Sequence, residues 1–125
     1  MKLRAIRENH LYSKAYSRGK KFVGRYVVVY LLPDYAAKKL AKANPTGQMV
    51  NRVGITVTKK LGGAVVRNRA KRIIREGYLS SSKNCNIKKG FLVVLVARAG
   101  IVNAKSWNVA SDMSMAFERL GMIVK

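Results

Sequence analysis

The chain has 125 residues, of which 26 are Lys or Arg and only 5 are Asp or Glu, so its formal net charge is +21 at pH 7. A field of this size opposes compaction by self-repulsion and is normally offset by a polyanion, most often the phosphate backbone of a nucleic acid. Hydrophobic residues make up 49% of the chain, which excludes a disordered polybasic tail and predicts a single folded domain over residues 1–125.

A helix and a strand are predicted in the first quarter of the chain. Residues 9–18 have the pattern of a short helix that ends at Gly19, with Tyr12 and Tyr16 on one face. Residues 22–32 alternate as a strand. Its predicted core positions are Val23, Val27, Val29 and Leu31. Its opposite face is predicted to carry Phe22, Tyr26 and Tyr30.

A lysine-bearing excursion and a second strand follow. Residues 33–48 contain both prolines of the chain and predict one or two helical turns at most. Residues 52–58 alternate again, and we expect them to pair with the strand at 22–32 as a hairpin with a long loop. The inward positions are Val53, Ile55 and Val57, and the outward positions are Arg52, Thr56 and Thr58.

The hydrophobic period changes from two to 3.6 after Gly62 and Gly63, in the stretch AVVRNRAKRIIRE at residues 64–76. One side of the predicted helix is apolar or small and holds Val66, Ala70, Ile73, Ile74 and Gly77. The other side holds Arg67, Asn68, Arg69, Lys71, Arg72 and Arg75. Packing of the apolar side against a core would therefore hold the basic side in a fixed array.

The last third of the chain predicts a loop, a strand and a helix. Residues 80–90 form a polar loop, and residues 91–97 are apolar at every position, which is typical of an interior strand covered on both faces. Residues 104–120 have apolar side chains at helical spacing and predict a core helix. These side chains are Trp107, Ala110, Met113, Ala116 or Phe117, and Leu120. The order of helices and strands indicates an α+β domain.

Autonomous catalysis and membrane insertion are both disfavoured. The five acids are scattered in sequence, and His10 and Cys85 are each the only residue of their type, so neither a zinc site with the usual ligands nor an intramolecular disulfide is expected. No phosphate-binding loop motif occurs. No apolar run approaches the ~20 residues of a membrane-spanning helix, and the N-terminus lacks the apolar segment of a signal peptide. We therefore expect a cytoplasmic, soluble protein.

Two features indicate RNA binding, each with a simpler alternative. The basic helix face could be merely solvated, but solvated faces usually mix both charge signs, and only Glu76 is acidic here. Arginines on a rigid helix can bind phosphate oxygens bidentately. Tyrosines on the first helix and strand could each be ordinary half-buried residues, but together they resemble surfaces that stack on single-stranded bases.

The block GITVTKKLGGAVVRNRAKRIIRE at residues 54–76 closely resembles the signature of the protein subunit of bacterial ribonuclease P, whose central motif is seen here as Arg67-Asn68-Arg69. LYSKAYSRGKKFVGRYVVVYLL resembles the N-terminal helix and first strand of that family, and LVVLVARAG resembles its last strand. The sequence departs from the family in three ways. The first-helix aromatics are tyrosines where phenylalanines are common, Gly63 stands where a polar residue, often asparagine, is common, and the excursion at residues 33–48 is longer than expected.

The resemblance implies an α+β sandwich like the second domain of ribosomal protein S5, with the motif helix in a left-handed βαβ crossover. It also implies that the RNA subunit is the catalyst, which uses magnesium ions to cleave precursor tRNA to a mature 5′ end, and that the protein needs no obligate protein partner. By resemblance, the residues facing the catalytic RNA are Lys59, Lys60, Arg67, Asn68, Arg69, Lys71, Arg72 and Arg75. Those in the cleft for the 5′ leader are Tyr12, Tyr16 and Tyr30.

Two other functions stay open at this point. A ribosomal or assembly-type RNA-binding module without a catalytic partner would suit the same fold and the same basic helix. A basic DNA-compacting protein suits the tyrosine-bearing face less well, because exposed aromatics favour single strands over a duplex.

Overall fold

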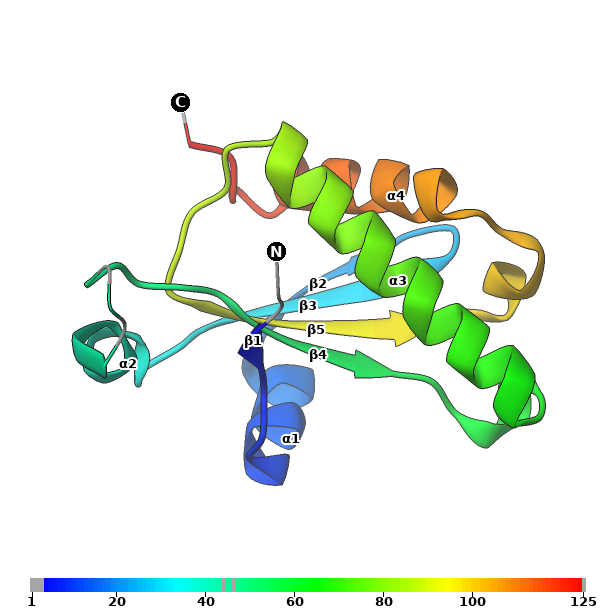
Figure 1. Cartoon of the computed structure of the whole chain (residues 1–125), viewed down its shortest axis with the longest axis horizontal. Coiled ribbons are helices and arrows are strands. Elements are labelled where there is room, and N and C mark those ends of the chain that lie inside the picture. The colour runs from blue at the N-terminus through cyan, green and yellow to red at the C-terminus, as the bar shows by residue number, and fades with distance from the viewer. Residues whose placement is uncertain (1–3, 44, 46, 125) are drawn as a thin grey trace.

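A five-stranded mixed sheet organises the computed structural model, which describes residues 4–43, 45 and 47–124. The strands are β1 (Arg4–Ala5), β2 (Lys20–Val23), β3 (Val27–Pro33), β4 (Arg52–Thr56) and β5 (Phe91–Ala97). Their order in the sheet is β1-β4-β5-β3-β2. Strand β4 runs parallel to β1 and β5, whereas β3 runs antiparallel to β5 and β2 (Figure 1).

Helices cover both faces of this sheet. The helices are α1 (Asn9–Arg18), α2 (Ala37–Ala43), α3 (Ala64–Asn84) and α4 (Ser106–Arg119), with short 3₁₀ turns η1 (Lys59–Leu61) and η2 (Ala99–Asn103). Figure 1 shows α3 and α4 side by side over one face and α1 beneath the other. The α3 connection between the parallel strands β4 and β5 is left-handed, against the strong preference for right-handed crossovers. The predicted α+β sandwich is confirmed.

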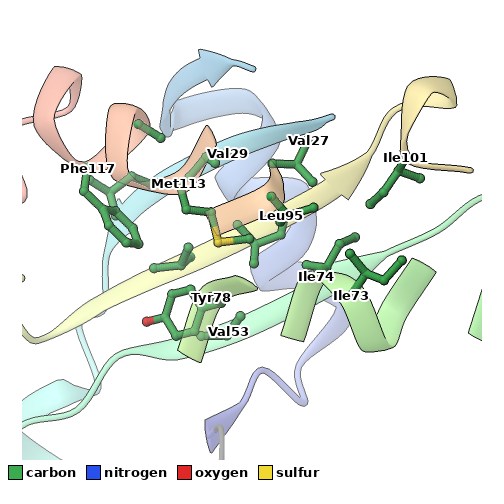
Figure 2. Close-up of a cluster of buried hydrophobic side chains, with 14 of the residues drawn as sticks. Val27, Val29, Val53, Ile73, Ile74, Tyr78, Leu95, Ile101, Met113 and Phe117 are labelled. Carbon is green, nitrogen blue, oxygen red and sulfur yellow. The ribbon is translucent and has the colours of Figure 1, made fainter. Parts of the chain in front are cut away.

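The larger core lies between the sheet and the layer of α3 and α4 (Figure 2). Ile74 from α3, Leu95 from β5 and Phe117 from α4 are fully buried there. The Tyr78 ring packs edge to face on Phe117, with the ring centroids 6.0 Å apart. Burial raises the pKa of Tyr78 to about 12, so its hydroxyl stays neutral inside the core at physiological pH.

A smaller core on the opposite face explains why β5 is apolar at every position. Its buried side chains are Ile6, Ala15, Leu32, Leu92 and Val94. They join α1 and the segment before it to β3 and β5. Consecutive residues of β5 point to opposite faces of the sheet, so both layers require apolar side chains from it. The predicted interior strand at 91–97 is confirmed.

The predicted single strand at 22–32 is wrong, because the chain reverses at Gly24 to form the β2–β3 hairpin. The Asp112 carboxylate accepts hydrogen bonds from the backbone N–H groups of Tyr26 (2.6 Å) and Val27 (3.3 Å). A Cβ at Gly24 would lie 2.7 Å from that carboxylate, so the turn requires glycine. The reversal leaves Val23 53% exposed instead of buried.

The faces of the aromatic residues change with this hairpin. Phe22 lies opposite Val29 in the hairpin. Both Phe22 and Tyr26 pack on the larger core. Tyr30 lies on the other face, against the smaller core beneath α1. The prediction that these three aromatics share one face is therefore wrong.

The pairing and faces of β4 also differ from prediction. Strand β4 does not pair with β3 as a hairpin but lies between β1 and β5. Val53 is buried as expected. Arg52 was expected to face outward, yet it is buried, and its guanidinium donates to Asp34 at 2.8 and 3.0 Å and to Glu8 at 2.8 Å. The hydrogen bond to Asp34 raises the pKa of Arg52.

Two further predictions near the C-terminus need correction. Helix α3 continues through the expected loop at 80–90 as far as Asn84, because Ser81 is buried and its hydroxyl lies 3.0 Å from that of Ser114 on α4. Trp107 is 68% exposed rather than part of the core, and the buried position in that turn of α4 is Val109.

We predict that Arg52→Ala lowers the free energy of unfolding by about 3 kcal/mol, because the nearly buried Asp34 carboxylate loses its counter-ion. Urea denaturation of the variant beside Arg75→Ala, an exposed arginine on α3, measures this difference. Equal midpoints for the two variants would show that the Arg52 ion pairs contribute nothing net to stability.

Candidate nucleic-acid interface

Three of the predicted site residues, Tyr12, Tyr16 and Tyr30, come together where α1 crosses the sheet, and we call them the tyrosine surface. The rings of Tyr16 and Tyr30 meet edge to face, with centroids 5.0 Å apart and planes at 73°. The Tyr16 hydroxyl is hydrogen-bonded to the Thr56 hydroxyl of β4 at 3.1 Å. These two contacts hold the Tyr16 ring in place. Since Tyr16 is 41% exposed, the ring is also open to a stacking partner.

Tyr12 forms the base of this surface. A Cβ at Gly54 would lie 2.5 Å from the Tyr12 ring, so glycine at that position of β4 lets the ring lie flat against the sheet. The Tyr12 hydroxyl donates to the carbonyl oxygen of Ile6 at 3.5 Å. Burial, reinforced by the neighbouring Tyr16, raises the pKa of Tyr12. Tyr12 therefore packs the smaller core as well as lining the surface.

The same face of the sheet continues beyond the tyrosines. Val28 and Val96 point to this face and are only half buried. Lys21 pairs in register with Tyr30 across the hairpin and is exposed. A cation therefore lies next to the aromatic rings, although the single-strand prediction for residues 22–32 hid it. The register of β2 on β3 is the signal that identifies Lys21.

The second group of predicted residues lies on η1 and α3, on the far side of the sheet from the tyrosine surface (Figure 1). Six of the eight are exposed: Lys59, Lys60, Asn68, Lys71, Arg72 and Arg75. We call these six the basic surface. Ala70, Ile73 and Ile74 are buried on the opposite side of α3. The predicted division of this helix into an anchored side and a basic side is thus present.

The other two residues of that group, Arg67 and Arg69, are half buried. The Arg69 guanidinium donates to the carbonyl oxygens of Val102 at 3.0 Å and Ala104 at 2.9 Å, at the end of η2. Arg69 therefore fastens α3 to the loop that leads into α4. The Arg67 Nε is buried and has no hydrogen-bond partner in the described part of the chain.

The described residues contain no cluster of three or more His, Cys, Asp or Glu side chains that could hold a metal ion. His10 and Cys85 lie apart, the first on α1 and the second after α3. Within the same residues, no helix is both long and apolar enough to cross a membrane.

Comparisons with known proteins agree on one family. The family model described as Ribonuclease P matches residues 1–121. The Ribonuclease P protein component of Clostridium acetobutylicum is 33% identical over 124 residues, which cover 99% of this chain and 94% of the relative. That of Caldanaerobacter subterraneus is 36% identical over 103 residues, covering 82% and 77%.

Solved structures show the same fold. An RNase P protein of Staphylococcus aureus superposes with a TM-score of 0.73 at 23% identity, covering 98% of this chain and all of that one. The RNase P protein of Thermotoga maritima gives a TM-score of 0.70 at 24% identity, covering 92% and 96%.

Proposed function

Since this chain belongs to the ribonuclease P protein family, we propose that its basic surface binds the catalytic RNA subunit and its tyrosine surface binds the 5′ leader of precursor tRNA. A member of this family is the protein component of a ribonucleoprotein endoribonuclease that matures the 5′ end of tRNA, and the RNA subunit carries the catalysis. The observation that supports the proposal is that exposed cations on η1 and α3 and tyrosine rings on α1 and β3 lie on opposite faces of one sheet.

The basic surface suits a folded RNA because most of its charges project from one helix whose other side is anchored in the core. Ile73 and Ile74 anchor α3 in the larger core, so Arg72 and Arg75 project from a rigid rod. Each planar guanidinium can bind two phosphate oxygens at once, and each neutralised phosphate releases condensed counterions. Lys59 and Lys60 in η1 extend this charge from the start of α3 back toward β4.

The tyrosine surface suits a single strand because it offers exposed ring area beside a cation. Stacking of an unpaired base on an aromatic ring is worth about 1–3 kcal/mol and tolerates any base. Tyr16 and Tyr30 provide the rings, and Lys21 lies where it can meet a phosphate. A leader can be any sequence, so this tolerance is the property that the substrate requires.

The two surfaces together would favour turnover. The leader is present in precursor tRNA and absent from mature tRNA, so contacts with it strengthen substrate binding without slowing release of the product. We further propose that the net charge of +21 screens repulsion between phosphates, so that the RNA subunit requires less magnesium. The magnesium ions would enter through the RNA, and the complex would act in the cytoplasm.

We expect this chain to stimulate 5′ cleavage of a labelled precursor tRNA by a bacterial ribonuclease P RNA at low magnesium, and to be inactive without that RNA. Gel analysis of the 5′ product measures the effect. Tight RNA binding without stimulation would instead favour an RNA-binding module with no catalytic partner.

Replacing both Arg72 and Arg75 by Ala should weaken association with the RNA subunit and reduce the slope of log K against log salt by about 2, one for each lost phosphate contact. The unfolding free energy should not change, because both side chains are exposed. Filter binding at several salt concentrations measures the slope, with Arg119→Ala on α4 as the control.

For Arg69→Ala, by contrast, we expect the free energy of unfolding to fall by about 1 kcal/mol, because the two hydrogen bonds to η2 are lost.

Tyr16→Ala should weaken binding of precursor tRNA about fivefold or more and leave binding of mature tRNA unchanged, because only the precursor has a 5′ leader whose bases can stack on this ring. Tyr16→Phe is the matched control, since it keeps the ring and removes only the hydrogen bond to Thr56. An equal loss on both tRNAs would remove the leader from the tyrosine surface.

A further inference from the structure

A cavity of about 620 Å³ lies between α1, α2 and the end of the sheet, and it shares no lining residue with the tyrosine surface. Its volume falls within the range of small-molecule and single-nucleotide sites. Residues 33–43, the first part of the lysine-bearing excursion, close one side of it, and their helix α2 projects past the sheet in Figure 1. The functions proposed above use no part of this segment.

The cavity has a fixed framework. Leu11 of α1, Leu32 of β3 and Leu92 of β5 form its apolar lining. Asp34 accepts hydrogen bonds from the Arg52 side chain and, at 3.0 Å, from the backbone N–H of Ala36. One buried carboxylate therefore ties the segment that leads into α2 to strand β4, and both line the cavity.

The rim of the cavity carries an aromatic ring and cations. Tyr35 is 80% exposed, and the Lys14 Nζ lies 4.7 Å from the centre of its ring. Lys39 of α2 also lines the cavity. The open Tyr35 ring can offer a face to a partner. Lys14 beside the ring and Lys39 in the same lining favour a partner with negative charge.

Two further polar residues line the cavity. Glu8 and His10 line the cavity at the start of α1, and the Glu8 side chain stays 42% exposed while it pairs with Arg52. A carboxylate and an imidazole can hydrogen-bond the edge of a base. Apolar walls, an exposed aromatic ring, polar lining residues and nearby lysines suit one unpaired nucleotide.

We propose that this cavity is a second site for single-stranded RNA, which receives one unpaired base against Tyr35 and binds the adjoining phosphates through Lys14 and Lys39. The site is independent of the tyrosine surface, because α1 separates the two sets of residues: Tyr12 and Tyr16 serve one and Leu11 and Lys14 the other. It rests on the function proposed above and adds to it a second binding site for single-stranded RNA.

The test is equilibrium binding of a labelled pentaadenylate to the whole chain, measured by fluorescence anisotropy in a Tyr16→Ala background that weakens the tyrosine surface. Adding Tyr35→Ala should weaken binding about fivefold or more, whereas Tyr35→Phe should bind like the background because it retains the ring. Lys14→Gln should also weaken binding, and Lys83→Gln at the end of α3 is its matched control. Because Tyr35 is exposed, circular dichroism should show an unchanged fold.

An abasic oligonucleotide of the same length separates stacking from charge. Its affinity should be the same with and without Tyr35→Ala, and an equal loss on both oligonucleotides would overturn the proposal. A stronger effect of Tyr35→Ala on an acidic peptide than on pentaadenylate would overturn it in favour of a protein partner. The assay contains no ribonuclease P RNA, so its failure would leave the cleavage experiment unaffected.

In the assembled complex, photo-crosslinking from position 35 to precursor tRNA or to the RNA subunit would identify the source of the nucleotide. Crosslinking to neither would overturn the proposal.

Discussion

Burial of β5 on both faces is the constraint on which the rest of this structure depends. Leu92, Val93, Val94 and Leu95 are successive residues of one strand and all are fully buried. Such a strand is stable only when an apolar layer covers each face of the sheet, so α3 and α4 must lie on one face and α1 on the other. The two candidate RNA surfaces lie on opposite faces for the same reason, because α3 carries most of one, α1 carries part of the other, and these helices cover opposite faces of β5.

The few acidic residues are largely used inside the fold. Glu8 and Asp34 pair with Arg52, and Asp112 closes the β2–β3 turn, which leaves Glu76 and Glu118 as the fully exposed acids. The exterior is therefore more uniformly basic than the composition alone implies. This distribution lets internal carboxylates hold the backbone together while the outside attracts a polyanion. The buried carboxylates thus serve the stability of the free chain, whereas the exposed cations are the groups available to RNA.

The candidate surfaces differ in what they can recognise. In the proposed function, guanidinium groups on α3 would bind phosphates of a folded RNA and so position the two partners. Tyrosine rings on α1 and β3 would stack on unpaired bases, whatever their identity. The proposed α2 cavity would add a second place for such a base. Arg69, which belongs to the Arg67-Asn68-Arg69 motif, is half buried and holds η2 through two hydrogen bonds, so it also supports the fold.

Local periodicity was enough to predict the helix at residues 9–18, the two sides of α3 and the interior strand β5. It also placed Tyr12 and Tyr16 on one face of α1. These features depend only on neighbours a few residues apart. The reversal at Gly24, the inward Arg52, the length of α3 and the exposure of Trp107 could not be predicted in this way. The first three depend on a distant partner. The carboxylate that closes the hairpin turn is 86 residues from Tyr26, Asp34 binds Arg52, and Ser114 is hydrogen-bonded to Ser81. The sequence alone therefore determined which chemical groups are available, the cations and the aromatic rings. Only the tertiary structure decided which of them share a surface, because that is set by contacts between residues far apart in the chain.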